Sequence, residues 1–335
     1  MDQTLKEAAR RIAVVFPPQG TQFVGMGKDV YEASAAARRI FQQAEEALGI
    51  DLRKLCFEGP EELLRETINS QPAILTVSIA CWEALKEKWA ALGEVIQPRF
   101  FAGHSLGEYT ALVAAGSLDF RDAVKLVRER GRLMKEEGDK NPGGMAAVIG
   151  LDDEALEEVC QEVADKGVVH PANYNSPGQV VISGELAALT AALELAVERG
   201  ARKVVRLAIS IASHSPLMRH TSEHLSRAVA AAGLADARVP IIANVSAKAI
   251  SSAEDIRREL VEQITGRVRW SQSILAMVEE GVQTIVEIGP GETLSGLSRR
   301  VSRDLQALSV NSIDAIVQFP ARLQEIEARR AAARA

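Results

Sequence analysis

A glycine-serine-glycine turn joins a predicted strand to a predicted helix in the first third of the chain. Residues 99–102 are mainly apolar, and residues 106–115 form a helical stretch rich in small side chains. Between them lies Gly103-x-Ser105-x-Gly107, which has the spacing of a nucleophile elbow. Small residues let the strand and helix approach closely and hold the serine hydroxyl clear of the sheet. The stretch predicts an α/β protein in which Ser105 is a nucleophile or, alternatively, a surface serine in a glycine-rich turn.

Composition limits the class of protein further. The chain has 335 residues, 47% of them hydrophobic, which suffices for one large domain or two. Its net charge of −6 argues against a nucleic-acid-binding protein, which needs a basic surface. The odd, widely spaced cysteines (Cys56, Cys81, Cys160) favour reduced thiols and a cytoplasmic location. With neither a signal peptide nor an apolar run of membrane-spanning length, we expect no membrane association.

The apolar periodicity predicts two regions of different organisation. Strands are expected at residues 12–16, 99–102, 241–244, 284–288 and 307–310, with helices at 32–48, 61–67, 72–92, 106–115, 119–137, 254–264, 271–279 and from Pro216. Residues 69–72 are expected to cap the third of these helices, with Pro72 in its first turn. After a break at residues 141–144 come strands at 145–149, 170–174, 179–183 and 203–209 and helices at 152–165 and 186–198. This βαββαβ order predicts an inserted ferredoxin-like subdomain.

The expected domain division follows from this order. We predict a discontinuous large domain of residues 1–141 and 210–315, built on a mainly parallel sheet, and a small subdomain of residues 142–209. Residues 316–335 are rich in Ala, Arg and Glu and form a tail, either helical or frayed.

Arg130 occupies an unusual position in the predicted helix 119–137. Helical spacing places it within the apolar stripe, three residues after Val127 and four before Met134. A buried arginine without an anionic partner is costly, so Arg130 is expected to pair with a carboxylate. That carboxylate belongs either to the protein or to a substrate held in a bidentate clamp.

His214 is the candidate general base. It follows the strand ending near residue 209 and precedes Ser215-Pro216, a helix cap and first helical residue. The helix N-terminus favours neutral imidazole, as a general base requires; the alternative is a loop histidine without a role. His220 and His224 are four residues apart, but no third ligand has suitable spacing, so we predict no metal site.

Eight stretches in order carry a family resemblance. They lie at residues 16–22, 71–73, 103–109, 130–131, 173–179, 213–215, 263 with 268–270, and 287–291. Together they resemble the malonyl-CoA:acyl carrier protein transacylases, the acyltransferase family of fatty-acid and polyketide synthesis. The resemblance covers residues 11–315 and implies a hydrolase-like large domain, with the ferredoxin-like subdomain forming one wall of the cleft.

The resemblance also implies roles for individual residues. Ser105 is expected as the nucleophile and His214 as its base, oriented by a backbone carbonyl near Gln263 in place of a triad carboxylate. The backbone amides of Gln19 and Leu106 are expected to form the oxyanion hole. The implied substrate-binding residues, of which Arg130 pairs with the malonyl carboxylate, are Arg130, Gln71, Asn175 and Gln263.

The expected reaction is malonyl transfer from malonyl-CoA to the phosphopantetheine thiol of an acyl carrier protein. No metal or cofactor beyond the coenzyme A thioester is required, and we expect a monomer. Two departures from the family pattern are Pro18, where glycine is usual, and Ala212-Ser213-His214, which resembles the methylmalonyl-selective form. A methylmalonyl-selective or trans-acting polyketide acyltransferase therefore stays open.

Two more distant alternatives remain. A serine thioesterase or hydrolase with the chain order Ser…Asp…His is possible, because four aspartates lie between the serine and the histidine: Asp139, Asp152, Asp153 and Asp165. A non-catalytic module that binds acyl-CoA or carrier protein is the other. Arg130 distinguishes these possibilities, because neither a hydrolase of neutral esters nor a bare binding module needs it together with Ser105 and His214.

Overall fold

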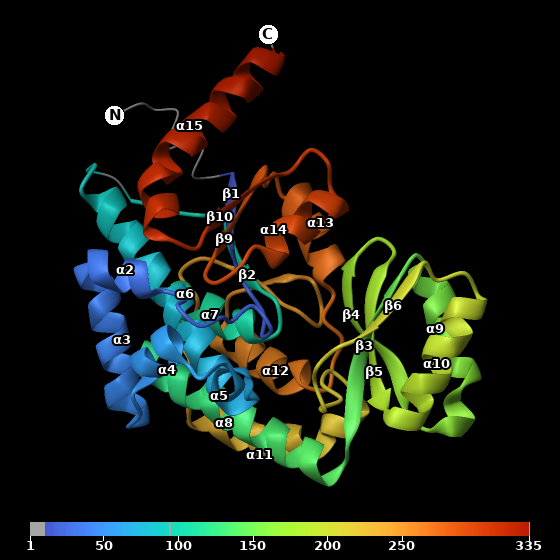
Figure 1. Ribbon diagram of the computed structural model, residues 1–335. Coiled ribbons are helices and arrows are strands. Elements are labelled where there is room, and N and C mark those ends of the chain that lie inside the picture. The colour runs from blue at the N-terminus through green and yellow to red at the C-terminus, as the bar shows by residue number, and fades with distance from the viewer. Residues whose placement is uncertain (1–10, 94, 335) are drawn as a thin grey trace.

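The computed structural model describes residues 11–93 and 95–334 and contains two β-sheets with helices packed around them (Figure 1). The strands of the larger sheet are β1 (Ile12–Phe16), β2 (Phe100–Gly103), β7 (Ile241–Ile242), β8 (Ala249–Ile250), β9 (Thr284–Ile288) and β10 (Gln306–Val310). Their order is β10-β9-β1-β2-β7-β8, parallel throughout except for the antiparallel pair β7–β8. The predicted α/β class and mainly parallel sheet are confirmed.

Strand β1 shows why the larger sheet needs helices on both faces. Ile12, Val14 and Phe16 belong to one hydrophobic core, while Ala13 and Val15 belong to another on the opposite face. All five side chains are buried, as expected for a central strand of a parallel sheet. The continuous apolar run in the sequence therefore reflects burial on both faces.

Helices cover both faces of this sheet. The first core is formed with helices that include α3 (Ala35–Leu48), α6 (Thr67–Ala90), α7 (Leu106–Ala114) and α8 (Phe120–Lys140). The opposite core is formed with α13 (Trp270–Glu279) and α14 (Thr293–Val301). The remaining helices of the larger part are α2 (Lys28–Ala33), α4 (Leu52–Glu58), α5 (Glu61–Arg65), α11 (Arg219–Ala231), α12 (Ala253–Gln263), α15 (Ile313–Arg334) and the short 3-10 helix η2 (Pro216–Met218).

The smaller sheet consists of residues from the middle of the chain. Its strands β3 (Gly143–Ile149), β4 (Val169–Ser176), β5 (Gln179–Glu185) and β6 (Lys203–Arg206) are antiparallel in the order β4-β5-β3-β6. Helices α9 (Asp153–Glu162) and α10 (Leu186–Glu198) pack on one face with a core of their own, and η1 (Ala164–Lys166) follows α9. Figure 1 shows both helices on the side of this sheet that faces away from the larger sheet.

The two sheets meet at a short segment before α13. Asn173 of β4 forms a parallel bridge with Val268. The amide of Tyr174 donates to the carbonyl of Val268 at 2.9 Å, and the amide of Val268 donates to the carbonyl of Ala172 at 2.8 Å. The side chain of Arg267 adds contacts to Tyr174 and to a glutamate of α9. Backbone pairing thus ties the small sheet to the larger part.

Two predicted helix starts are wrong. Helix α6 begins at Thr67 and contains Pro72, so residues 69–72 are not its cap. The carbonyl of Glu66 already accepts from the amides of Asn69 and Ser70, at 2.8 Å each, and the first turn therefore forms before Pro72. The helix predicted at 32–48 is two helices, because the hydroxyl of Ser34 accepts from the amide of Ala37 and caps α3.

Two predicted strands are too long, and the C-terminal tail packs on the larger part. β6 ends at Arg206 and β7 at Ile242; Ile209 lines the cavity described below, and the amide of Asn244 bonds a carboxylate. The tail is helical, but α15 begins at Ile313, and three of its side chains are buried in the first core: Ile316, Phe319 and Leu323. Within residues 11–93 and 95–334, no helix has the length and apolar character needed to cross a membrane.

Candidate active site

Ser105 sits in the strained turn between β2 and α7. Its backbone angles are φ 50° and ψ −104°, outside the regions that L-residues favour. A Cβ atom on Gly107 would lie 2.1 Å from the carbonyl oxygen of Phe16, and one on Gly103 would lie 2.0 Å from the backbone of Gly107. Both glycines are therefore required by close backbone contacts, and the predicted nucleophile-elbow geometry is present.

Asn244 holds this turn in place. Its Oδ1 accepts from the amide of Ser105 at 2.7 Å, and its Nδ2 donates to the carbonyl of Gly103 at 2.7 Å. Asn244 is 1% exposed and follows β7, the neighbour of β2 in the sheet. No role for Asn244 was predicted from the sequence. The available signal was its polar side chain at the carboxyl end of a strand, where ligands and functional groups gather in open α/β sheets.

His214 contacts the serine hydroxyl directly. Its Nε2 lies 2.7 Å from Ser105 Oγ, while its Nδ1 lies 2.9 Å from the carbonyl oxygen of Gln263 and 3.1 Å from that of Gly266. Because two carbonyl oxygens face Nδ1, this atom carries the proton and Nε2 accepts from the hydroxyl. Burial, reinforced by the positive charge of Arg130, lowers the pKa of His214 to about 3. Backbone carbonyls, and not an aspartate carboxylate, face Nδ1, so the site does not have the Ser…Asp…His arrangement.

Arg130 reaches the same hydroxyl from α8. Its Nη2 donates to Ser105 Oγ at 3.0 Å and to Gln263 Oε1 at 3.2 Å, and its Nη1 donates to Gln71 Oε1 at 2.9 Å. The side chain is 1% exposed, its guanidinium lies 5.5 Å from the centre of the Tyr109 ring, and its Nε has no hydrogen-bond partner among the described residues. Burial lowers the pKa of Arg130.

All three of these acceptors are neutral oxygens, and none of the salt bridges found among residues 11–93 and 95–334 involves Arg130. The alternative of a structural ion pair with a protein carboxylate is therefore not what the structure shows. A buried cation without an anionic partner is poised to bind an anion.

A cavity of about 260 Å³ opens beside these groups. Loops and helices of the larger part and strands of the smaller sheet line it: Ser105, His214 and Gln19 come from the larger part, and Asn175 comes from β4, with Met145 of β3. The other lining residues are Pro18, Thr67, His104, Arg130, Met134, Ala147, Asn173, Gln179, Val181, Leu207, Ile209, Ile211, Ser213, Thr293 and Leu297. A lining that combines apolar side chains with a few polar groups is typical of a small-molecule site.

The remaining predicted residues lie around this cavity or behind it. Leu106 is the first residue of α7, directly after Ser105. Gln19 lies in the loop after β1, and its Oε1 accepts from Thr67 Oγ1 at 2.8 Å. Asn175 Oδ1 accepts from His104 Nε2 at 2.9 Å, and burial lowers the pKa of His104 to about 4. Gln71 and Gln263 do not line the cavity; their side-chain oxygens accept hydrogen bonds from the guanidinium of Arg130.

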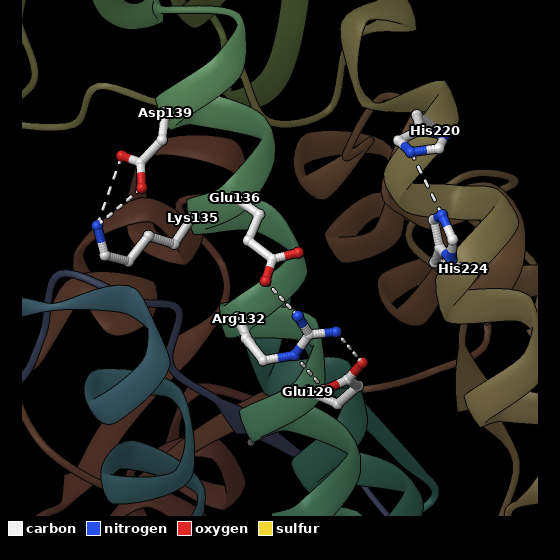
Figure 2. Close-up of polar contacts among 7 residues, drawn as sticks. All are labelled: Glu129, Arg132, Lys135, Glu136, Asp139, His220 and His224. Carbon is white, nitrogen blue, oxygen red and sulfur yellow. Dashed lines mark hydrogen bonds and ion pairs between the residues drawn. The ribbon is translucent and has the colours of Figure 1, made fainter.

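The histidine pair weighed as a metal site lies elsewhere, on α11. Figure 2 shows His220 and His224 facing each other, with their Nε2 atoms 3.3 Å apart. The charged residues drawn beside them on α8 pair among themselves: Arg132 with Glu129 and Glu136, and Lys135 with Asp139. Among the residues that the structure describes, no three His, Cys, Asp or Glu side chains are grouped as metal ligands.

A serine on a strained strand-to-helix turn, with a neutral imidazole on its hydroxyl, is the arrangement of enzymes that transfer acyl groups through a serine. Known proteins specify this class further. The family model for the acyl transferase domain matches residues 13–317, and the chain belongs to this family.

Several relatives are similar over nearly their whole length. A malonyl CoA-acyl carrier protein transacylase of Bacillus subtilis is 47% identical over 307 residues, covering 91% of this chain and 95% of the relative. The corresponding Escherichia coli K12 protein is 40% identical, covering 91% and 97%. A crystal structure of an acyl carrier protein S-malonyltransferase from Vibrio cholerae has a TM-score of 0.88 at 40% identity, covering 92% and 99%. A malonyl-transacylase in complex with its type II PKS acyl-carrier protein has the same TM-score and identity, covering 92% and 98%.

Proposed function

We propose that this protein transfers a malonyl group from malonyl-CoA to the phosphopantetheine thiol of an acyl carrier protein, through a malonyl-serine intermediate. The observation that carries the proposal is the buried guanidinium of Arg130, which contacts neutral oxygens and lies 3.0 Å from the serine hydroxyl. An acyl group with a free carboxylate supplies the missing anion. The names of the relatives at 40–47% identity support the same substrate and acceptor.

In the first half-reaction, His214 Nε2 takes the proton of Ser105 Oγ as the oxygen attacks the thioester carbonyl. The amides of Gln19 and Leu106 stabilise the oxyanion, and the latter also lies at the N-terminus of α7. The carbon–sulfur bond then breaks, and the coenzyme A sulfur leaves with the proton from His214. The product is the malonyl-serine ester.

The second half-reaction reverses these roles. His214 takes the proton of the carrier-protein thiol as its sulfur attacks the ester carbonyl, and Ser105 Oγ leaves with that proton. Arg130 binds the malonyl carboxylate throughout and so orients the carbonyl toward the serine. Gln71 and Gln263 hold the guanidinium, and Asn175 lines the cavity from the smaller sheet. These groups supply every proton and charge that the reaction needs, so the mechanism requires no metal or cofactor.

The proposal includes the wider organisation of the molecule. We assign residues 1–141 and 210–315 to a hydrolase-like catalytic domain, of which residues 1–10 and 94 lie outside the described residues. Residues 142–209 form a ferredoxin-like subdomain whose sheet lines one side of the cavity. The strand order β4-β5-β3-β6 with two helices on one face supports the second assignment. The protein acts as a monomer in the cytoplasm, where its three buried cysteines stay reduced. Its partners are malonyl-CoA and the carrier protein, with neither nucleic acid nor membrane.

Methylmalonyl transfer is the second candidate. Ser213, directly before the base, lines the cavity, and its small side chain leaves space for a methyl branch on the acyl group. The same catalytic groups serve both substrates. A competition among malonyl-, methylmalonyl- and acetyl-CoA, with carrier protein as acceptor, decides between them.

The direct test is covalent labelling. Incubation with malonyl-CoA in the absence of carrier protein should add one malonyl mass to the peptide that contains Ser105, and added carrier protein should remove it. The Ser105→Ala variant is the control and should stay unlabelled. A wild-type serine that stays unmodified under conditions of turnover would refute the covalent mechanism.

A further inference from the structure

Glu108 is a buried carboxyl group to which the mechanism above gives no role. It lies on α7 one turn after Ser105 and is 0% exposed. Its Oε1 accepts from the amide of Asn244 at 2.9 Å, and its Oε2 accepts from Gln263 Nε2. Both partners contact the reacting groups, because Asn244 holds the Ser105 turn and Gln263 contacts Arg130.

The side-chain amide of Gln263 has two ends with opposite hydrogen-bonding character. In the observed orientation Nε2 donates to Glu108 and to the carbonyl of Ser105, the latter at 2.9 Å, and Oε1 accepts from Arg130 Nη2. A flipped amide would place its NH₂ group against the guanidinium, donor against donor. The Oε2 of Glu108 accepts from Gln263 Nε2, so Glu108 favours the orientation in which the amide oxygen faces Arg130.

We propose that Glu108 is a positioning residue for recognition of the acyl carboxylate, because it fixes the Gln263 amide that in turn fixes Arg130. The inference rests on the proposed function, and in it Glu108 acts on the substrate only through Gln263 and Arg130. Glu108 touches neither the serine hydroxyl nor the cavity. Its effect is therefore expected in the choice of acyl group more than in the acyl-transfer step.

Glu259 on α12 is a second buried carboxyl group close to Glu108. Its Oε1 accepts from the amide of Val245, the residue after Asn244, at 2.8 Å. Burial raises the pKa of both carboxyl groups, that of Glu259 to about 7. Glu259 thus shares the buried surroundings of Glu108, but Glu108 is the one that bonds the Gln263 amide.

This arrangement predicts that the same substitution has different effects at the two sites. In Glu108→Gln, one of the two N–H donors must face the new NH₂ group, and where that donor is Gln263 Nε2, only the carbonyl of Ser105 still accepts from it. In Glu259→Gln, the new amide oxygen can still accept from Val245, and Gln263 keeps its bond to Glu108. The second variant is therefore the matched control.

The experiment measures kcat/KM for malonyl-CoA and for acetyl-CoA with carrier protein as acceptor. Glu108→Gln should lower the malonyl-to-acetyl ratio by about tenfold, the effect of a mispaired buried hydrogen bond, mainly through KM for malonyl-CoA. Glu259→Gln should keep the ratio within about twofold of wild type. An unchanged ratio in folded Glu108→Gln, or an equal loss in both variants, would overturn the proposal. A wild-type protein without malonyl preference would instead refute the proposed function.

Gln263→Met keeps the test valid if Glu108→Gln does not fold. Methionine has a similar length but lacks the amide, while the backbone carbonyl that orients His214 stays in place. The malonyl-to-acetyl ratio should fall in this variant by about tenfold, as expected for Glu108→Gln. An intact ratio in Gln263→Met would show that Glu108 does not act through Gln263. Where Glu108→Gln does fold, adding it to Gln263→Met should lower the ratio no further, and additive losses would overturn the proposal.

Discussion

Ser105 and His214 both have positive φ, 50° and 57°, which L-residues rarely adopt. Such angles persist where surrounding bonds fix them, and each costs about 1–3 kcal/mol. Here Asn244 bonds the amide of Ser105, and the carbonyl of Ile264 accepts from the amide of His214 at 3.1 Å. The strain brings the hydroxyl and imidazole to 2.7 Å, so it serves the geometry of the site.

Arg130 is predicted to determine which acyl group is accepted. Arg130→Ala should lower kcat/KM for malonyl-CoA by about a hundredfold, because the carboxylate loses its buried partner, and should leave acetyl transfer unchanged or faster. Arg132→Ala is the control, since Arg132 lies on the same helix but pairs with Glu129 and Glu136 at the surface. Equal losses for both substrates would indicate that Arg130 is structural.

The pH dependence of acylation follows from His214. Its pKa is lowered from 6.5 to about 3, so the imidazole stays neutral, as a base must, well below pH 6.5. Single-turnover acylation by malonyl-CoA should therefore stay nearly constant from pH 8 to pH 5 and fall only as pH approaches the lowered pKa. Rapid-quench measurements across this range check the prediction. A decline with a midpoint near 6.5 would mean that burial does not control this histidine.

At the scale of elements, the turn between β2 and α7 depends on Gly107. Gly107→Ala would place a methyl group 2.1 Å from the carbonyl oxygen of Phe16, in a contact between backbones that cannot yield locally. We expect a loss of about 2–4 kcal/mol in the free energy of unfolding and a larger loss of acylation, since β1 and α7 must separate. Urea denaturation and single-turnover kinetics measure the two effects. Gly296→Ala, where a Cβ meets no atom within 4 Å, is the control.

The elements that could be predicted from the sequence are those specified by their own residues, through apolar runs and glycine spacing. The apolar run of β1 and the glycines around Ser105 reflect burial and close contact that their own residues specify. The start of α6 was predicted wrongly because proline usually lies in the first turn of a helix. Most of α6 is buried, and its tertiary packing tolerates Pro72 inside the helix. Asn244 was missed because its partners at 103 and 105 are about 140 residues away, a relation that no local pattern records.

At the scale of the whole molecule, one segment connects the small sheet to the catalytic base. The carbonyl of Gly266 accepts from His214 Nδ1 at 3.1 Å, and two residues later Val268 pairs with β4. Between them, Arg267 Nη1 lies 2.8 Å from Glu157 Oε1 and 2.9 Å from the Tyr174 hydroxyl. The cavity is lined by the smaller sheet on one side and by loops and helices of the larger part on the other, so this junction lies where its two walls join.

Arg267→Ala tests how far the side chain secures this junction. About a third of the Arg267 and Glu157 side chains is exposed, so the variant should lose about 0.5–1 kcal/mol of stability. That loss should be local to the junction. Hydrogen exchange at the amides of Tyr174 and Val268, which form the backbone bridge, should therefore quicken by about two- to fivefold. Arg199→Ala is the control, because Arg199 pairs with Glu158 and Glu162 inside the small part and should leave these amides protected. Unchanged exchange in Arg267→Ala would show that backbone pairing alone holds the two sheets together.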